Sequence, residues 1–294
     1  MSLRFAYNTN GTNSHRLDDA LMLMAETGYA GVALTLDHNH FDPFAPTWRA
    51  DAEKLAKRLR GLNFGSVIET GARYLLDPRA KHEPTLVTAD PAGRARRIAF
   101  LHRAIDIGEI LGSEAVSFWA GVPKPGVDPD EARDWLRAGL EQVVAYAGRR
   151  GVVAALEPEP GMLVETVDDY NDLASGLPGL KLALDTGHLL VTGEREPAAA
   201  VAEFAGVLGT VSIEDMRRGE HVHLPFGEGD MDVPALLDAL EASSFGGLVC
   251  VELSRDGHRA DLMIPQAFSY LSLCRGNVRA APSAGEPAGR EDLH

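Results

Sequence analysis

The stretch from Ser212 to Asp232, SIEDMRRGEHVHLPFGEGDMD, brings acids and histidines close together. His221 and His223 stand one residue apart, so an extended backbone would point both rings in the same direction. Imidazole and carboxylate are the ligands that divalent transition metals prefer. By itself the stretch fits a metal site and a polar loop equally well. Six of its acids and histidines, all within seventeen residues, are candidate ligands: Glu214, Asp215, His221, His223, Glu228 and Asp230.

Carboxylates also stand at the ends of three predicted strands. Glu157 ends one strand, with Glu159 two residues further on, and Glu252 ends the last. Asp185 ends a third strand, and His188 follows it in the same strand-to-loop turn. Three uncompensated carboxylates in one pocket would repel one another and raise one another's pKa. A divalent cation would resolve that repulsion, so these strand ends predict a metal site.

The elements that must position these side chains alternate between strand and helix. Strict alternation implies a parallel sheet, and eight units in about 275 residues imply a closed (β/α)8 TIM barrel, with its active site at the C-terminal ends of the strands. An open doubly wound sheet would need a glycine-rich turn after the first strand, where only Gly11 is found. The predicted strands cover residues 4–7, 31–36, 65–68, 115–119, 151–157, 180–185, 207–213 and 248–253.

Helix start signals fall between these strands. Asp90 and Asp128 each precede a proline, which suits the first helical position. Thr166 opens a capping box, in which a threonine and an acid three residues later satisfy each other's backbone N–H groups. Ser14 is expected to cap the first helix, which Gly28 would close.

The domain organisation follows from where periodicity stops. Beyond Gly276 the tail shows no helical or strand pattern. We therefore expect a single barrel domain over residues 1–275 and a disordered tail over residues 276–294.

Composition narrows the class of partner and compartment. A formal charge of −15, from 28 basic and 43 acidic residues, argues against nucleic acid, because phosphate binding needs a basic surface. The two cysteines, Cys250 and Cys274, lie in apolar surroundings and indicate a reducing compartment. No signal peptide and no apolar run of membrane length is evident, so we expect a cytoplasmic protein without a membrane partner.

Four motifs resemble those of one family. They are LEPEP (156–160), LALDTGHL (182–189), HVHLPFGEGDMD (221–232) and CVEL (250–253). The sequence is similar to the xylose isomerase-like TIM barrels, which include sugar and sugar phosphate isomerases and epimerases, inosose dehydratases and zinc apurinic-site endonucleases. Barrels of this kind are commonly dimers or tetramers, so a homo-oligomer stays open.

The resemblance implies a metal centre and a mechanism. Glu157, Asp185 and Glu252 would bind a divalent metal (Mn, Zn, Co or Mg), and His188 would contact the substrate or the metal. The metal would act as a Lewis acid towards an enediolate intermediate. Glu157 and Glu252 would move the proton on the two sides of the substrate.

One position departs from the family pattern. The family completes its metal site with a histidine in a strand-seven motif like V-H-I-K-D, where this chain has Ser212. Either three carboxylates and water hold the metal, or a neighbour replaces the histidine, or the metal has moved. His221 and His223 could also join His188 in a three-histidine site, which suits a catalytic zinc.

Candidate substrate contacts surround the same strand ends. Guanidinium groups in an acidic protein suggest an anionic or polyhydroxylated substrate, although surface ion pairing would explain them equally well. Trp119 could form an apolar wall against a sugar face, or it could be a residue of the hydrophobic core. The candidates are His188, Arg218, Arg73, His40 and Trp119.

The function that we predict from the sequence is a metal-dependent isomerase or epimerase of a small sugar, sugar phosphate or polyol. A dehydratase or lyase on the same scaffold would use the same residues, because one fold hosts many reactions. A metal-dependent hydrolase of a phosphate or other ester would suit the histidines. A binding protein without catalysis is supported only by Ser212. An endonuclease would need histidines where Glu69 and Trp119 end their strands.

Overall fold

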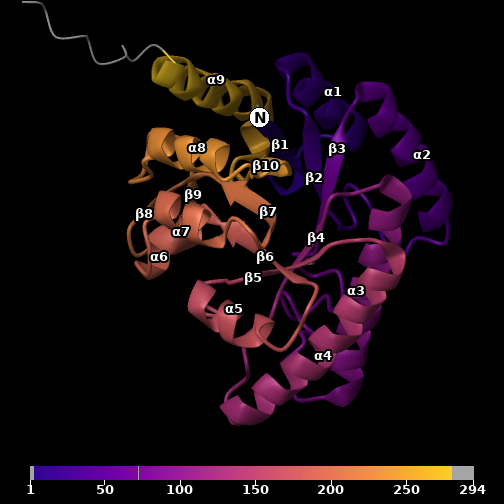
Figure 1. The fold of residues 1–294 in the computed structure, drawn as a ribbon. Coiled ribbons are helices and arrows are strands. Elements are labelled where there is room, and N and C mark those ends of the chain that lie inside the picture. Colours follow the sequence, from indigo (N-terminus) through magenta and orange to yellow (C-terminus); the bar gives the residue numbers. More distant parts are fainter. Residues whose placement is uncertain (1–2, 72, 280–294) are drawn as a thin grey trace, which may run out of the picture.

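The computed structural model describes residues 3–71 and 73–279 and has a closed barrel of eight parallel strands at its centre (Figure 1). Around the barrel the strands follow the order β1-β10-β7-β6-β5-β4-β3-β2, so neighbours in sequence are neighbours in the sheet. The predicted (β/α)8 barrel is therefore confirmed. The barrel strands are β1 (Arg4–Asn8), β2 (Gly31–Thr35), β3 (Gly65–Glu69), β4 (Val116–Trp119), β5 (Ala154–Glu157), β6 (Leu180–Asp185), β7 (Leu208–Ile213) and β10 (Leu248–Val251).

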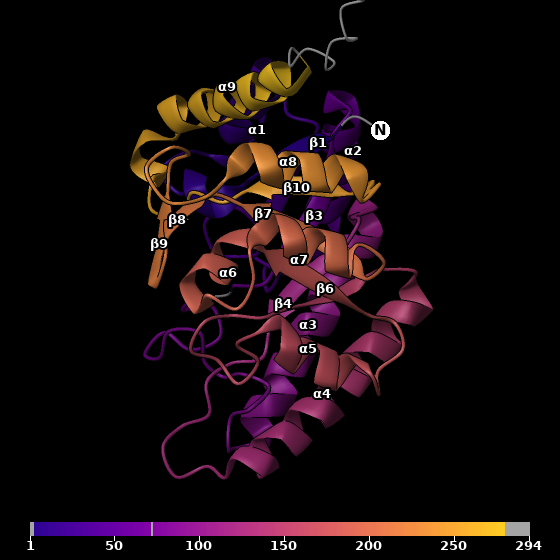
Figure 2. The same cartoon turned by 60° about the vertical axis from the view of Figure 1, so that its left-hand side comes forward.

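Helices cover the outside of this barrel, as Figures 1 and 2 show from two sides. None of the helices in the described part of the chain is both long enough and apolar enough to cross a bilayer. They are α1 (Leu17–Thr27), α2 (Trp48–Leu62), α3 (Pro91–Leu111), α4 (Pro129–Arg150), α5 (Val167–Ala174), α6 (Thr186–Thr192), α7 (Pro197–Phe204), α8 (Val233–Ala242) and α9 (Ala260–Arg279).

Most of the predicted helix boundaries are found in the structure. Asp90 and Asp128 accept hydrogen bonds from the first turns of α3 and α4, and Thr166 forms the expected capping box. The expected cap at Ser14 is wrong. Residues 13 and 14 form a turn after the 3-10 helix η1 (Thr9–Thr12), and α1 begins three residues later, at Leu17, with Arg16 at its N-cap.

Two elements are additional to the predicted ones. Helix α6 begins directly at the end of β6, and a two-stranded hairpin of β8 (Asp215–Arg217) and β9 (Glu220–Leu224) projects beyond β7 (Figure 2). At the C-terminus α9 runs to Arg279, across the expected boundary at 275. The rest of the predicted tail, 280–294, lies outside the described residues.

Strand side chains divide between two apolar cores. Side chains such as Phe5, Leu34 and Phe118 point outward and pack under the helices in a large cluster. The inward side chains of the lower barrel are mostly small, and Ala33, Ala155 and their neighbours fill the narrow interior. Because successive residues alternate between these two faces, the last inward residue of each strand reaches the C-terminal mouth.

The capping box at α5 gives a direct test of local stability. Thr166 Oγ1 accepts from the Asp169 N–H at 3.1 Å, and an Asp169 oxygen accepts from the Thr166 N–H at 2.9 Å. Thr166→Ala should lower the free energy of unfolding by about 1 kcal/mol in a urea titration. Arg16→Ala is the control, because Arg16 precedes α1 without a side-chain capping bond. Equal losses in the two variants would contradict the prediction.

Candidate active site

The inward face of the barrel changes from apolar to acidic at the C-terminal mouth. In four strands an inward apolar residue is followed two positions later by a carboxylate on the same face. The pairs are Val67 and Glu69, Ala155 and Glu157, Ala183 and Asp185, and Cys250 and Glu252. On β7 the corresponding pair is Ser212 and Glu214, both buried. We call Glu69, Glu157, Asp185, Glu214 and Glu252 the acidic layer.

Neighbouring strands bring the acidic layer together. Asp185 pairs with Ser212 across β6 and β7, and the Glu252 N–H donates to Ile213 O at 3.1 Å beyond the end of β10. Strands β5 and β10 therefore flank the β6–β7 pair on its two sides. This places Glu157 and Glu252 on either side of Asp185 and Glu214.

The acidic layer carries more negative charge than its surroundings neutralise. Burial, and then neighbouring carboxylates, raise the pKa values of Glu69, Glu157 and Glu214 well above their usual range. Burial also opposes charge on Asp185, but His188 and His223, together with the neighbouring Glu214 carboxyl and the His188 N–H, outweigh it and lower the Asp185 pKa. A divalent cation would stabilise the charged form of these carboxylates, so the donor set fits a metal.

The two carboxylate oxygens of Asp185 have different surroundings. Its Oδ1 accepts from the N–H groups of Gly187 and His188, at 2.8 and 3.2 Å, and so caps α6. Its Oδ2 is buried without a hydrogen-bond partner. The cap therefore fixes the direction in which the second oxygen points.

His188 lies above Asp185 and is buried. Its Nδ1 lies 3.0 Å from the carbonyl oxygen of Pro158, and because a carbonyl can only accept, Nδ1 carries a proton. Nε2 lies 3.5 Å from Asp185 Oδ2 and 3.9 Å from Glu159 Oε2. Burial opposes the charged ring, but Asp185 and then Glu159 outweigh it and raise the His188 pKa.

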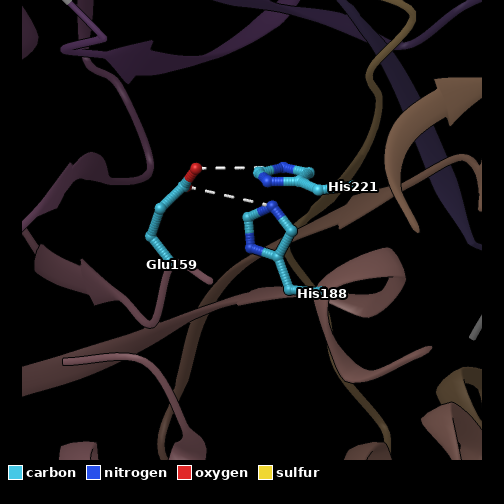
Figure 3. A group of neighbouring side chains, drawn as sticks. All are labelled: Glu159, His188 and His221. Atoms are coloured by element: carbon cyan, nitrogen blue, oxygen red, sulfur yellow. Dashed lines mark ion pairs between the residues drawn. The ribbon is translucent and has the colours of Figure 1, made fainter. Parts of the chain in front are cut away.

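The hairpin supplies the other two histidines. His221 and His223 lie on β9 and line the same cavity, so the expectation that their rings point the same way is met. His221 Nε2 is 3.8 Å from Glu159 Oε1, and Figure 3 shows Glu159 directed at both His221 and His188. Burial, with His188 and His223, lowers the His221 pKa to about 4. His223 Nδ1 lies 4.0 Å from Glu214 Oε2.

Three groups of these side chains could each hold a cation, with one ligand atom per residue and all atoms within 4.8 Å of one another. Among the described residues, neither a three-histidine group nor a group containing Glu252 meets this criterion. The three groups are Glu159 with His188 and His221, Glu157 with Asp185 and His188, and Asp185 with Glu214 and His223.

Glu157 and Glu252 have polar partners of their own. Glu252 accepts from Asn10 Nδ2 at 2.7 Å and from Asn8 Nδ2 at 3.4 Å. Glu157 accepts from Ser117 Oγ at 3.3 Å, and its other oxygen lies 3.9 Å from His188 Nδ1. Neutral donors and an imidazole thus hold each carboxylate towards the centre of the mouth.

A cavity of about 370 Å³ opens over the acidic layer. Of the predicted substrate contacts, Arg73, Trp119 and His188 line it. Arg218 and His40 do not: Arg218 pairs with Glu196 at 2.9 Å, and His40 Nε2 lies 3.1 Å from His15 O.

The wall that carries Trp119 is supported by a buried cation. The Arg97 guanidinium lies 4.2 Å from the centre of the Trp119 ring, and its Nη2 donates to Thr70 O at 3.3 Å. Burial lowers the Arg97 pKa to about 9. His82 meets the same tryptophan edge-on, with ring centres 5.3 Å apart. Trp119 therefore forms a wall of the cavity, and Arg97 and His82 pack against its ring.

Three acids of the site were not among the predicted site residues. Glu159 follows Glu157 by two residues, Glu69 ends β3, and Glu214 lies two residues beyond Ser212. The alternation of strand faces was the available signal for Glu69 and Glu214. Asp215 has a structural role instead, since it accepts from the N–H groups of Gly227 and Met231 at 2.8 and 3.0 Å.

A closed parallel barrel with acids and histidines at the C-terminal ends of its strands has the architecture of a (β/α)8 barrel, in which the active site lies at that end. Residues 21–273 match the model of the xylose isomerase-like TIM barrel family. The chain belongs to this family.

Individual relatives are distant. An L-ribulose-5-phosphate 3-epimerase UlaE of Escherichia coli (strain SMS-3-5 / SECEC) is 23% identical over 238 residues, which cover 80% of this chain and 81% of the relative. A solved L-ribulose 3-epimerase has a TM-score of 0.74 at 20% identity and covers 97% of this chain and 100% of its own. An IOLI protein solved with a zinc atom has a TM-score of 0.72 at 18% identity, covering 94% and 98%.

Proposed function

We propose that this protein is a metal-dependent enzyme that epimerises or isomerises a small ketose or ketose phosphate by moving a carbon-bound proton. The observation that carries the proposal is the acidic layer, four of whose carboxylates line one cavity with His188, His221 and His223 beside them. The family and the epimerase relatives point to the same class of reaction.

The buried acids account for the need for a cation. Asp185 is the carboxylate shared by two of the three candidate groups, and its Oδ2 has no hydrogen-bond partner. Asp185 would therefore hold the metal together with neighbours from the acidic layer and a histidine. When bound, a divalent cation would stabilise the negative charge that the substrate gains on losing its proton.

Glu157 and Glu252 are the groups that move the proton. They flank Asp185 from β5 and β10, so a substrate above Asp185 has one glutamate on each face. Burial, and then the neighbouring carboxylates, raise the pKa of Glu157, so it takes up a proton more readily than an exposed glutamate does. Asn8 and Asn10 hold the Glu252 carboxylate in place.

The far wall of the cavity suits the remainder of the substrate. Arg73, Lys81 and His82 line it beside Trp119. Cations at one end can bind a phosphate or a hydroxyl group, and the tryptophan can cover an apolar sugar face. A ketose or its phosphate fits this division between an acidic floor and a basic rim.

Solvent exchange tests the reaction directly. The purified protein, stripped of metal and reloaded separately with Mn²⁺, Co²⁺, Zn²⁺ or Mg²⁺, would be incubated in D₂O with L-ribulose or L-ribulose 5-phosphate. We expect deuterium to enter C3 as the 3-epimer forms, because the proton exchanges with solvent at the glutamates. Exchange should require a divalent metal, and NMR measures both the label and the product.

The other outcomes separate the alternatives. Release of inorganic phosphate without exchange would indicate a hydrolase. Loss of a hydroxyl group, seen as an unsaturated product, would indicate a dehydratase. Binding of the sugar without exchange or product in any metal form would contradict the proposed activity.

A further inference from the structure

The strand-seven carboxylate Glu214 is the least satisfied polar group of the site. It is fully buried, and neither of its oxygens accepts a hydrogen bond from any described residue. A buried polar group without a partner is costly, so such a group usually has a ligand or a counter-ion. Glu214 is outside the family pattern that the sequence motifs follow.

The position of Glu214 is fixed by strand alternation. Ser212 and Glu214 point to the same inner face of β7, and Ser212 is the place where the family pattern has histidine. Ser212, which pairs with Asp185 across the two strands, has no imidazole to offer a metal. Glu214, one layer closer to the mouth, extends a carboxylate beside Asp185 instead.

A glycine keeps this space open for the carboxylate. A Cβ on Gly187, the second residue of α6, would overlap Glu214 Oε1 and the Met216 side chain. Any larger residue there would therefore push Glu214 out of its position. The glycine at position 187 of α6 therefore accommodates the Glu214 carboxylate.

Three neighbouring residues carry unsatisfied buried atoms. Asp185 Oδ2, both Glu214 oxygens and His223 Nδ1 are all buried without partners in the described residues. One ligand atom from each of these three residues lies within 4.8 Å of the other two. The other two candidate groups contain, apart from Asp185 itself, no side-chain atom of this kind in the described residues. One cation would satisfy all three residues.

We propose that Asp185, Glu214 and His223 are the protein ligands of the divalent cation, with Glu214 and His223 replacing the strand-seven histidine. The ligand set of two carboxylates and one imidazole suits Zn²⁺, Mn²⁺ or Co²⁺. Ligands at about 2.1 Å from a tetrahedral ion are roughly 3.4 Å apart. The 4.0 Å between His223 Nδ1 and Glu214 Oε2 therefore needs only a small closure.

This ligand set frees the flanking glutamates. With the cation on β6, β7 and the hairpin, Glu157 and Glu252 are left to transfer protons and need not also act as ligands. Only this role of Glu157 and Glu252 in proton transfer depends on the proposed function. The cation site itself can be tested without any substrate.

Metal binding by the full-length protein tests the ligand set. Stripped protein would be titrated with Co²⁺, followed by its visible absorption, and with Mn²⁺, followed by the EPR signal of the free ion. Glu214→Gln and His223→Ala should each weaken binding by at least about 10–100-fold, the loss seen when even an outer partner of a metal ligand is removed. His223→Ala should also change the Co²⁺ spectrum, because it removes the nitrogen ligand.

Matched controls come from the neighbouring group. His221→Ala removes the other hairpin histidine, and Glu159→Gln removes a cavity carboxylate outside the proposed set. Both should keep Co²⁺ affinity within a few-fold of the native protein. Glu214→Gln keeps the side-chain size, and circular dichroism would establish that it folds.

The outcomes separate this inference from the proposed function. Native affinity in Glu214→Gln and His223→Ala, with loss in His221→Ala or Glu159→Gln, would overturn the ligand set and leave the epimerase proposal standing. Loss of affinity in the two ligand variants, with no solvent exchange by the native protein, would keep the site and reject the epimerase. Absence of metal binding by the native protein would overturn the site.

Discussion

Replacing Glu157 or Glu252 by glutamine should lower kcat by about 10²–10⁴-fold, the usual contribution of a general acid or base. Glutamine keeps the shape of the side chain and its packing but cannot accept the carbon-bound proton. Because the two glutamates stand on opposite sides of Asp185, each variant should lose the proton transfer on its own face. The measurement is the rate of epimer formation at saturating substrate and metal.

Isotope exchange distinguishes proton transfer from a general loss of structure. A variant that has lost one glutamate can still exchange the proton that faces the other glutamate, so one variant should label the unreacted ketose and the other should label only the 3-epimer when that is supplied, and neither should interconvert the two. The control is Glu165→Gln, which changes an exposed glutamate in the loop after the same strand, β5. Equal losses of epimer formation in the control, or full activity in both Glu157→Gln and Glu252→Gln, would contradict the assigned roles.

Removal of the divalent cation should destabilise the folded protein as well as stop turnover. A ligand at about 1,000 times its Kd stabilises the folded state by about 4 kcal/mol. For a chain of this size that corresponds to a thermal midpoint lower by on the order of 10 °C after chelation. Differential scanning calorimetry of stripped and reloaded protein measures the shift.

The size of this destabilisation should grow with pH. Glu69, Glu157 and Glu214 have folded-state pKa values raised well above 4.5, so the folded metal-free protein binds more protons than the unfolded chain. Stability that depends on those protons is present below about pH 4.5 and is lost as pH rises towards the folded pKa values. His188, whose pKa is raised, acts in the same direction.

The Asp185 carboxylate changes the stability in the opposite direction, but in a different pH range. Its pKa is lowered, so its contribution is present above its ordinary value of 3.8 and is lost only in stronger acid. His221, whose pKa is lowered to about 4, also acts in the opposite direction, but only below the ordinary histidine value of 6.5. From pH 6.5 to 8 the thermal midpoint of the stripped protein should therefore fall, while the reloaded protein should change less. A stripped protein whose midpoint rises over this range would contradict the electrostatics described for the acidic layer.

Much of the fold could be predicted because each strand and helix carries its own local signal. The run from Leu180 to Asp185 is apolar and ends in an acid, and β6 has these bounds. Helix α6 was missed because Asp185 serves both as the last strand residue and as the helix cap, which leaves no loop between them. The hairpin was missed because a three-residue strand such as β8 gives almost no periodicity.

The site was harder to predict because its members depend on distances between strands. Glu214 and Asp215 are adjacent buried acids at the junction of β7 and β8, but the Glu214 oxygens have no hydrogen-bond partner in the described residues, whereas Asp215 accepts from the N–H of Gly227 in the following turn. Arg218 and His40 are polar residues that follow predicted strands, which is the pattern expected of cavity residues. Each has a closer local partner, Glu196 for Arg218 and the His15 carbonyl for His40.

The hairpin of β8 and β9 forms a sheet of its own, with no strand pairing to the barrel. It is held instead by Asp215 and by a hydrogen bond from the Gly219 N–H to Leu190 O at 3.1 Å. The two histidines are thus carried on a module whose sequence can change without disturbing the barrel ladder. Residues 218–224 could therefore be exchanged, by evolution or by design, to alter the metal preference without changing the strand pairing of the barrel.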